Sequence, residues 1–135
     1  MTPRMRISEE QNGDVTILRL TGRLELEDGD LMFRDAVNRL VAAGHVKIVL
    51  DFKDITRIDS AGIGMLVSKY LSARQRGGTI KLLHLTQHSD HLMDITRLGT
   101  VFEIYDDEGA ALGSFGADSE QESGIRTQES GLDQE

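Results

Sequence analysis

The sequence predicts one α/β domain with a mixed, mostly parallel sheet of about five strands, an N-terminal antiparallel hairpin and about four helices. Three observations carry this prediction. Segments with strand and helix periodicity alternate after residue 15, as in parallel strands joined by helical crossovers. The run 46–52 is almost continuously apolar, which a strand covered on both faces requires. The hairpin is indicated by Asn12-Gly13-Asp14, a turn-forming sequence between two strand-like segments.

The first elements are the hairpin and an amphipathic helix. Residues 5–8 alternate in polarity, and residues 15–20 are rich in β-branched and aliphatic side chains, so the two segments can pair. A polar bend follows over 25–30. A helix with an acidic first turn is expected next, closed by Gly44. Its apolar positions, at helical spacing, are Leu31, Phe33, Ala36, Val37, Leu40 and Val41.

The elements after the buried strand continue the alternation. A helix over 60–75 carries apolar side chains at helical spacing and ends at Gly77-Gly78. Ser89 is expected to cap the following helix, because its hydroxyl can accept a backbone N–H of the first turn. In order, the remaining predicted elements are a strand at 80–85, the helix at 89–98, a strand at 101–105 and a short helix at 107–112.

The composition excludes several classes of protein. The 135 residues include no Cys, which excludes disulfide scaffolds and Cys-based zinc sites. The net charge of −8 has the wrong sign for a nucleic-acid partner. No segment approaches the length of an apolar membrane span, and the N-terminus lacks the apolar region of a signal peptide. We therefore expect a cytoplasmic protein without a membrane partner.

The distribution of charge divides the chain at about residue 113. Residues 1–113 are expected to form the domain, and residues 114–135 an acidic disordered tail. The stretch 117–135 holds six carboxylates, one Arg and two widely spaced aliphatic residues. This segment cannot bury enough apolar surface to offset the entropy lost on ordering.

The most informative segment is 55–66, where a strand-to-helix loop places Ser60 at the start of a helix. Ser60 is expected to cap that helix. Gly62 and Gly64 occupy its opening turns, where each costs about 1 kcal/mol relative to Ala. The close approach of another backbone would offset this cost, and the positive end of the helix dipole would accept a phosphate on Ser60.

Ser60 lacks the surroundings of a catalytic nucleophile. Its nearest ionisable neighbours along the chain are Asp59, Arg57 and Asp54, and no Gly-x-Ser-x-Gly motif is present. We therefore expect no enzymatic activity and no cofactor.

Histidines offer the other route to an enzyme, through a metal. His88 and His91 have a spacing that suggests metal binding, and Asp90 and Asp94 lie close by. The sequence fixes no third ligand, however, so these histidines and His84 are interpreted as surface residues and no metal site is expected.

Residues 59–66, Asp-Ser-Ala-Gly-Ile-Gly-Met-Leu, resemble the Asp-Ser-x-Gly-x-Gly-x-Leu signature of the STAS family, the anti-sigma factor antagonists. Three further segments resemble the family in the same order. Residues 19–25 are similar to its Leu-x-Gly-x-Leu-Asp segment, residues 76–78 to the turn before its fourth strand, and residues 98–105 to the entry into its last strand. The resemblance spans about residues 5–113 and implies the STAS fold.

The resemblance also implies a mechanism. The chain would bind a cognate anti-sigma factor, an ATP-dependent serine kinase, and so free a sigma factor. That kinase would phosphorylate Ser60 and end the interaction, and a phosphatase would restore it. Glu25 stands where the family usually has Asp. Thr56 is a second hydroxyl in the loop that carries Ser60, and it is a further candidate phosphosite. A weak homodimer is a further candidate interaction, and the sequence leaves the oligomeric state open. The implied partner-binding residues are Glu25, Asp59, Ser60, Ala61, Gly62 and Gly64.

Two alternatives remain. Within the family, the chain could be a STAS adaptor subunit of a signalling scaffold or of a lipid-transport system. The alternative of another class is a phosphoaspartate receiver, because Asp51 ends an apolar strand as an acceptor Asp does. A receiver also needs an acidic pair after its first buried strand to hold Mg²⁺, and here that strand is followed by Thr21-Gly22-Arg23. The sequence therefore argues against a receiver.

Overall fold

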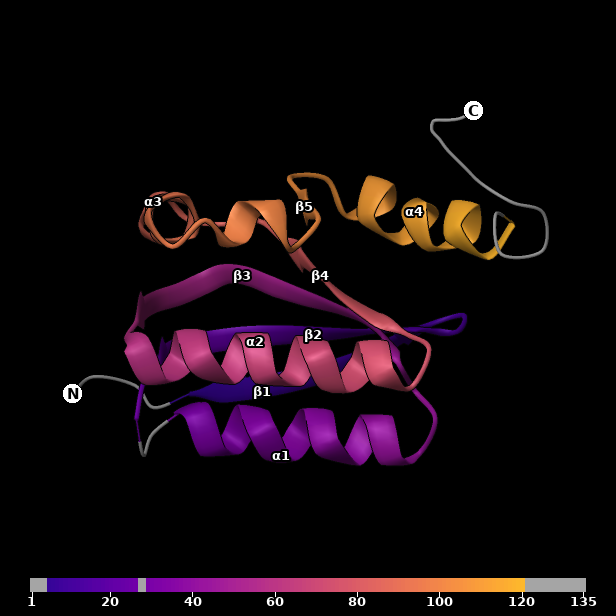
Figure 1. Ribbon diagram of the computed structural model, residues 1–135, viewed down its shortest axis with the longest axis horizontal. Helices are drawn as coiled ribbons and strands as arrows, with labels where there is room; N and C mark the ends of the chain where they lie inside the picture. The colour runs from indigo at the N-terminus through magenta and orange to yellow at the C-terminus, as the bar shows by residue number, and fades with distance from the viewer. Residues whose placement is uncertain (1–4, 27–28, 121–135) are drawn as a thin grey trace.

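The computed structural model describes residues 5–26 and 29–120 (Figure 1), with the backbone alone over 117–120. No helix within these ranges is long and apolar enough to cross a membrane. In chain order the elements are β1 Arg6–Asn12, β2 Val15–Leu24, α1 Gly29–Ala42, β3 Lys47–Ile58, α2 Ser60–Gln75, β4 Thr79–Leu83, α3 Gln87–Ile95, the 3-10 turn η1 Leu98–Thr100, β5 Ile104–Tyr105 and α4 Glu108–Glu120.

The five strands form one sheet in the order β1-β2-β3-β4-β5. The hairpin pair β1 and β2 is antiparallel, and the other three pairs are parallel. This mixed sheet with four helices confirms the predicted fold class. Because β2 and β3 are parallel, their carboxyl ends lie at the same edge of the sheet, and α2 begins at that edge.

The sheet separates two apolar clusters. α1 and α2 lie side by side on one face, and α4 covers part of the other (Figure 1). Alternate residues of β3 point to opposite faces, so Ile48 and Leu50 join the larger cluster with the α1 and α2 side chains, while Val49 faces α4. The smaller cluster consists of Val15, Ile17, Val49, Leu83, Ala111 and Phe115.

β2 and β3 continue beyond the predicted strands at 15–20 and 46–52. β3 extends to Ile58, which pairs with Leu24 at the end of β2. Two register shifts lie along this extension, and Gly22 has a φ of 109°, a conformation that suits glycine. The segment predicted as a strand-to-helix loop is therefore largely strand, and Thr56 lies within β3.

The cap of α3 differs from the prediction. The helix begins at Gln87, and Thr86 is its N-cap: the Thr86 hydroxyl accepts the N–H of Ser89 at 3.1 Å. Thr86 has the extended backbone that a cap requires, whereas Ser89 is buried in the first turn. The last strand is also shorter than the predicted 101–105, because η1 and the residues after it leave only Ile104 and Tyr105 in the sheet.

α4 extends well past the predicted helix at 107–112. Residues 114–116, which the sequence assigned to the tail, continue the helix, and Phe115 is only 3% exposed. The ammonium of Lys81 lies 4.2 Å from the centre of the Phe115 ring and 2.8 Å from the Ser114 hydroxyl. Three glycines lower the helix propensity of this segment, so packing on the sheet decides its extent. Residues 121–135, most of the predicted tail, lie outside the described residues.

Two truncations separate the contribution of α4 from that of the tail. A chain ending at Gly116 keeps Ser114 and Phe115, and its melting temperature should stay within about 2 °C of the full chain. A chain ending at Gly113 loses both, and burial of a Phe side chain contributes about 1.5–3 kcal/mol. Its melting temperature should fall by at least about 4–8 °C. Thermal melts followed by circular dichroism test this, and equal melting temperatures would contradict it.

Candidate functional site

Ser60 is the first residue of α2 and lies where β3 ends, next to the end of β2. Its side chain is exposed. The predicted cap is one residue off, because Asp59 and not Ser60 is the N-cap. The backbone of Asp59 is extended, so its carboxylate can accept an N–H of the first helical turn. The backbone of Ser60 is already helical, so its hydroxyl cannot reach those N–H groups. Among the residues that the structure describes, the Ser60 hydroxyl has no hydrogen-bond partner.

Asp59 joins the end of β3, the start of α2 and the segment after β2. Its Oδ1 accepts the N–H of Gly62 at 2.9 Å, and its Oδ2 accepts the N–H of Leu26 at 3.1 Å. Its own N–H donates to the carbonyl of Leu24 at 3.3 Å. Burial raises the pKa of the Asp59 carboxyl, but the hydrogen bonds from backbone N–H groups outweigh it and hold the pKa below its usual range. Asp59 is therefore ionised at neutral pH.

The two glycines of the motif have different surroundings. Gly62 is buried, and a Cβ added there would lie 2.2 Å from the carbonyl oxygen of Leu24. Its small size lets α2 approach the end of β2, which is a reason internal to the fold. Gly64 is exposed, and a Cβ there would meet no atom within 4 Å. Of the two, Gly64 is the one that offers an open position to another protein.

Glu25 lies in the bend that connects β2 to α1. Its carboxylate is 3.1 Å from Nε of Arg57 and 3.6 Å from Nε of Arg23, and its carbonyl accepts two N–H groups from the start of α1. The surface around this bend is partly apolar, because Leu26 is 63% exposed. Glu25 therefore shapes the loop beside Ser60 through ion pairs along the strand ends.

The remaining candidates are placed as follows. Ala61 is half-buried in the first turn of α2, beside Ser60. Thr56 has an exposed position in β3, and its hydroxyl donates to the carbonyl of Gly22 at 3.1 Å. That hydrogen bond bridges β3 to β2, so Thr56 has a structural partner that Ser60 lacks.

Three histidines lie on α3 or between β4 and α3. His88 and His91 line a hollow along α3 with Asp90 and Asp94, and His84 follows β4 and contacts Asp51. Within 5–26 and 29–116, where side chains are described, no three His, Asp or Glu side chains are placed to hold a metal ion.

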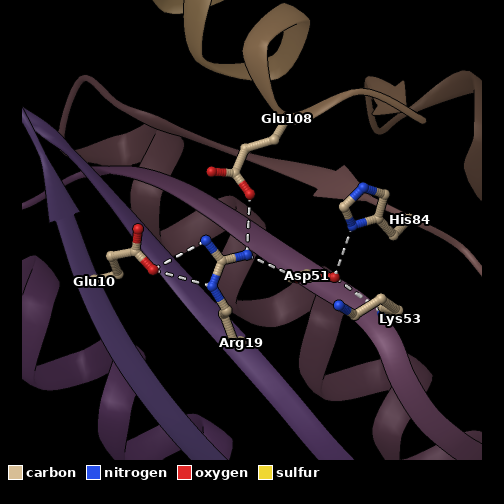
Figure 2. Close-up of polar contacts among 6 residues, drawn as sticks. All are labelled: Glu10, Arg19, Asp51, Lys53, His84 and Glu108. Carbon is tan, nitrogen blue, oxygen red and sulfur yellow. Dashed lines mark hydrogen bonds and ion pairs between the residues drawn. The ribbon is translucent and has the colours of Figure 1, made fainter.

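Asp51 belongs to a network that the sequence did not reveal (Figure 2). It lies within β3 rather than at the strand end, and it is 3% exposed. Its carboxylate is 2.8 Å from Nη1 of Arg19 and 3.1 Å from Nδ1 of His84, and it accepts the Lys53 N–H at 3.0 Å. Burial raises its pKa, but these partners outweigh burial and the pKa is lowered.

Arg19 is the centre of this network. It also contacts Glu10 of β1 at 2.9 Å and Glu108 of α4 at 3.0 Å, and these carboxylates raise its pKa, with Glu108 the strongest contributor. The only signals in the sequence were the charged residues Arg19 and Asp51 inside the apolar runs 15–20 and 46–52. Such a residue on a buried face needs a partner, but the sequence does not identify the partner.

Comparisons with known proteins agree with this architecture. A family model described as "Mlab, STAS domain" matches residues 7–104. The chain is 28% identical over 108 residues to the anti-sigma F factor antagonist of Paenibacillus polymyxa, covering 80% of this chain and 92% of that protein. It is 24% identical over 100 residues to the anti-sigma-B factor antagonist of Bacillus subtilis, covering 74% and 90%.

Solved structures show the same fold. The anti-sigma factor antagonist SpoIIAA in its unphosphorylated form has a TM-score of 0.72 at 18% identity, covering 83% of this chain and 97% of that one. The phosphorylated form of SpoIIAA, described as a Bacillus cell fate determinant, has a TM-score of 0.66 at 18% identity, covering 82% and 99%.

The assignment of the α2 cap can be tested with two alanine variants. Asp59→Ala removes the acceptor for the Gly62 and Leu26 N–H groups and should lower the free energy of unfolding by about 0.5–2 kcal/mol. Ser60→Ala should change it by less than about 0.5 kcal/mol, as for other exposed side chains. Urea unfolding measures both values. If Ser60→Ala lowers the free energy of unfolding as much as Asp59→Ala does, Ser60 also caps the helix.

The lowered pKa of Asp59 predicts a pH dependence of stability. A carboxyl whose folded pKa lies below its unfolded value of about 3.9 adds stability above that value and loses it as pH falls through the folded pKa. Asp59→Asn removes this titration, so the variant should lose less stability than the wild type between neutral pH and acid below about pH 4. Unfolding at a series of pH values tests this; parallel curves would contradict it.

Proposed function

This chain belongs to the STAS-domain family, and on that basis we propose that it is an anti-sigma factor antagonist switched by phosphorylation of Ser60. It binds a cognate anti-sigma factor, a serine kinase, and the bound kinase releases a sigma factor. Phosphorylation of Ser60 by the same kinase ends binding, and a phosphatase resets the protein. The observation that carries this proposal is an exposed Ser60 hydroxyl that its own helix does not use.

The geometry of α2 suits a phosphorylation switch. Because Asp59 caps the helix, modification of Ser60 breaks no hydrogen bond among the described residues. A phosphate on the first residue of a helix lies near the positive end of the helix dipole, which favours it. The free protein therefore tolerates the phosphorylated state, and the fold needs no rearrangement to reach it.

The surroundings of Ser60 explain why a phosphate would prevent binding. The neighbouring surface includes the apolar side chain of Leu26 and the open position at Gly64, both suited to close contact with a partner. Phosphoserine adds about −1.5 to −2 charge at pH 7, and it does so next to the ionised carboxylate of Asp59. Burying an unpaired charge in an interface costs several kcal/mol, so the phosphate acts on the complex.

The same surroundings support a role as a binding protein instead of an enzyme. Ser60 has no hydrogen-bonded base among the described residues, and a nucleophilic serine requires one. The named relatives in Paenibacillus polymyxa and Bacillus subtilis are antagonists, that is, regulators. We propose that Ser60 is a substrate of another enzyme and not a catalytic residue.

The switch predicts that folding and binding respond differently to charge at position 60. Ser60→Asp should leave the free energy of unfolding within about 1 kcal/mol of the wild type, because the residue is exposed near a helix N-terminus. Its affinity for the cognate anti-sigma factor kinase should fall by at least about a hundredfold, or 2.7 kcal/mol. Ser60→Ala should bind the kinase and resist phosphorylation. Calorimetric titration and a kinase assay measure these effects.

Ser68→Asp is the matched control, because Ser68 is also exposed on α2 and receives the same charge away from the motif. It should bind like the wild type. Equal affinities for Ser60→Asp and the wild type, with both folded, would show that Ser60 is not the switch. Capture of membrane-transport subunits in place of a kinase would favour the adaptor function.

A further inference from the structure

The strand β1 lies at one edge of the sheet, and no other described strand pairs with its outer side. It is the first strand in the order of the sheet and pairs with β2 alone among the described strands. Proteins usually protect such an edge with proline, charged side chains, a bulge or a covering segment. β1 contains no proline, and its pairing with β2 runs from Arg6 to Asn12 without a register shift, but Arg6, Glu9 and Glu10 are charged. Its outer edge can therefore accept another strand only in a register that brings opposite charges together.

An open groove of about 740 Å³ lies beside this edge, lined by Met5 and by residues of β1, β2, β3 and α1. Met5, Ile7, Met32 and Ala36 make part of it apolar, and Met32 is 46% exposed. None of the predicted partner-binding residues around Ser60 lines the groove. A partner at the β1 edge would thus contact a surface different from the one proposed for the kinase.

We propose that the partner at this edge is a second copy of the chain, with the two β1 strands antiparallel about a twofold axis at Ser8. Directly opposed residues in an antiparallel pair point to the same face of the sheet. In a symmetric pair of β1 strands, the residue at the twofold axis must therefore lie opposite the same residue of the other copy. An axis at Ser8 places Arg6 opposite Glu10 of the other copy, twice. An axis at Glu9 opposes two carboxylates, and one at Ile7 places Arg6 opposite Ser8 without an ion pair. Charge complementarity therefore selects Ser8.

The side chains needed for this register are available. Arg6 is exposed and forms no ion pair with any residue in the described part of the chain. Glu10 uses one carboxylate oxygen, Oε1, for both of its contacts with Arg19, at 3.1 and 2.9 Å (Figure 2). Its Oε2 can receive Arg6 of the other copy while the contacts with Arg19 persist.

The main chain fits the same register. Asn12 and Val15 flank a two-residue turn and form a hydrogen-bonded pair, so alternate residues counted from Asn12 direct their N–H and C=O groups to β2. Ile7 and Glu9 therefore direct theirs outward. An axis at Ser8 places Ile7 of one copy opposite Glu9 of the other, and the two copies then form one continuous sheet.

Sedimentation equilibrium over about a hundredfold range of concentration tests the dimer by mass action. Glu9→Pro removes an outward N–H but no hydrogen bond to β2, so it should keep its fold and weaken dimerisation by at least about tenfold. Glu9→Ala is the matched control, because it loses the same carboxylate and keeps the N–H. Its dimer dissociation constant should match that of the wild type within about threefold. A monomeric wild type at every concentration, or equal dimerisation of both variants, would overturn the proposal.

A charge exchange tests the register. Arg6→Glu alone and Glu10→Arg alone each convert two attractive pairs into repulsive ones and should each weaken dimerisation by about tenfold or more. An equimolar mixture pairs the two variants with opposite charges at both positions and should restore dimers. If the mixture stays monomeric, the register is wrong. Ser60→Asp should dimerise like the wild type. The dimer can therefore be confirmed or refuted independently of the proposed kinase interaction.

Discussion

The extended pairing of β2 with β3, completed by the carboxylate of Asp59, is the constraint on which the rest of the structure depends. β3 continues to Ile58 only because Leu24 continues β2 beside it. Asp59 then binds the segment after β2 and the first turn of α2 at the same time. One side chain therefore fixes the segment after β2, 33 residues earlier in the chain, relative to the junction of β3 and α2. The position and the exposure of Ser60 both follow from this arrangement.

In the proposed switch, Asp59 caps the helix and Ser60 is the phosphosite, so stability and regulation depend on different residues. A serine that capped its own helix would couple phosphorylation to helix stability, because the hydroxyl would lose its backbone partner. With the cap at Asp59, the energetic effect of the proposed phosphate would fall on the interface with a partner. Gly62 adds a steric requirement, since its contact with the Leu24 carbonyl leaves no room for a side chain. The motif thus combines internal packing at positions 59 and 62 with a free surface at positions 60 and 64.

The face of the sheet that α4 covers combines the smaller apolar cluster with a network of polar contacts. Arg19 and Asp51 lie on the face of β2 and β3 that is turned toward α4. Arg19 contacts three carboxylates, and Asp51 contacts Arg19 and the imidazole of His84. A buried ion pair is costly to break because one charge would remain without its partner. Glu108 attaches the first turn of α4 to this network, and Phe115 and Lys81 hold its later turns. The network also positions Glu10 on the open strand β1, and so it connects the packing of α4 with the proposed contact between two copies.

The sequence alone determined the fold class, the order of the elements and the motif around Ser60, because these depend on local periodicity, turn residues and short-range spacing. It assigned the caps of α2 and α3 to Ser60 and Ser89, whereas the structure has Asp59 and Thr86. All four side chains can cap a helix, so only the backbone conformation determines which of them does. It also could not find the partners of Arg19 and Asp51, or the burial of Phe115. Those contacts join strands and helices distant along the chain, so tertiary packing decided them.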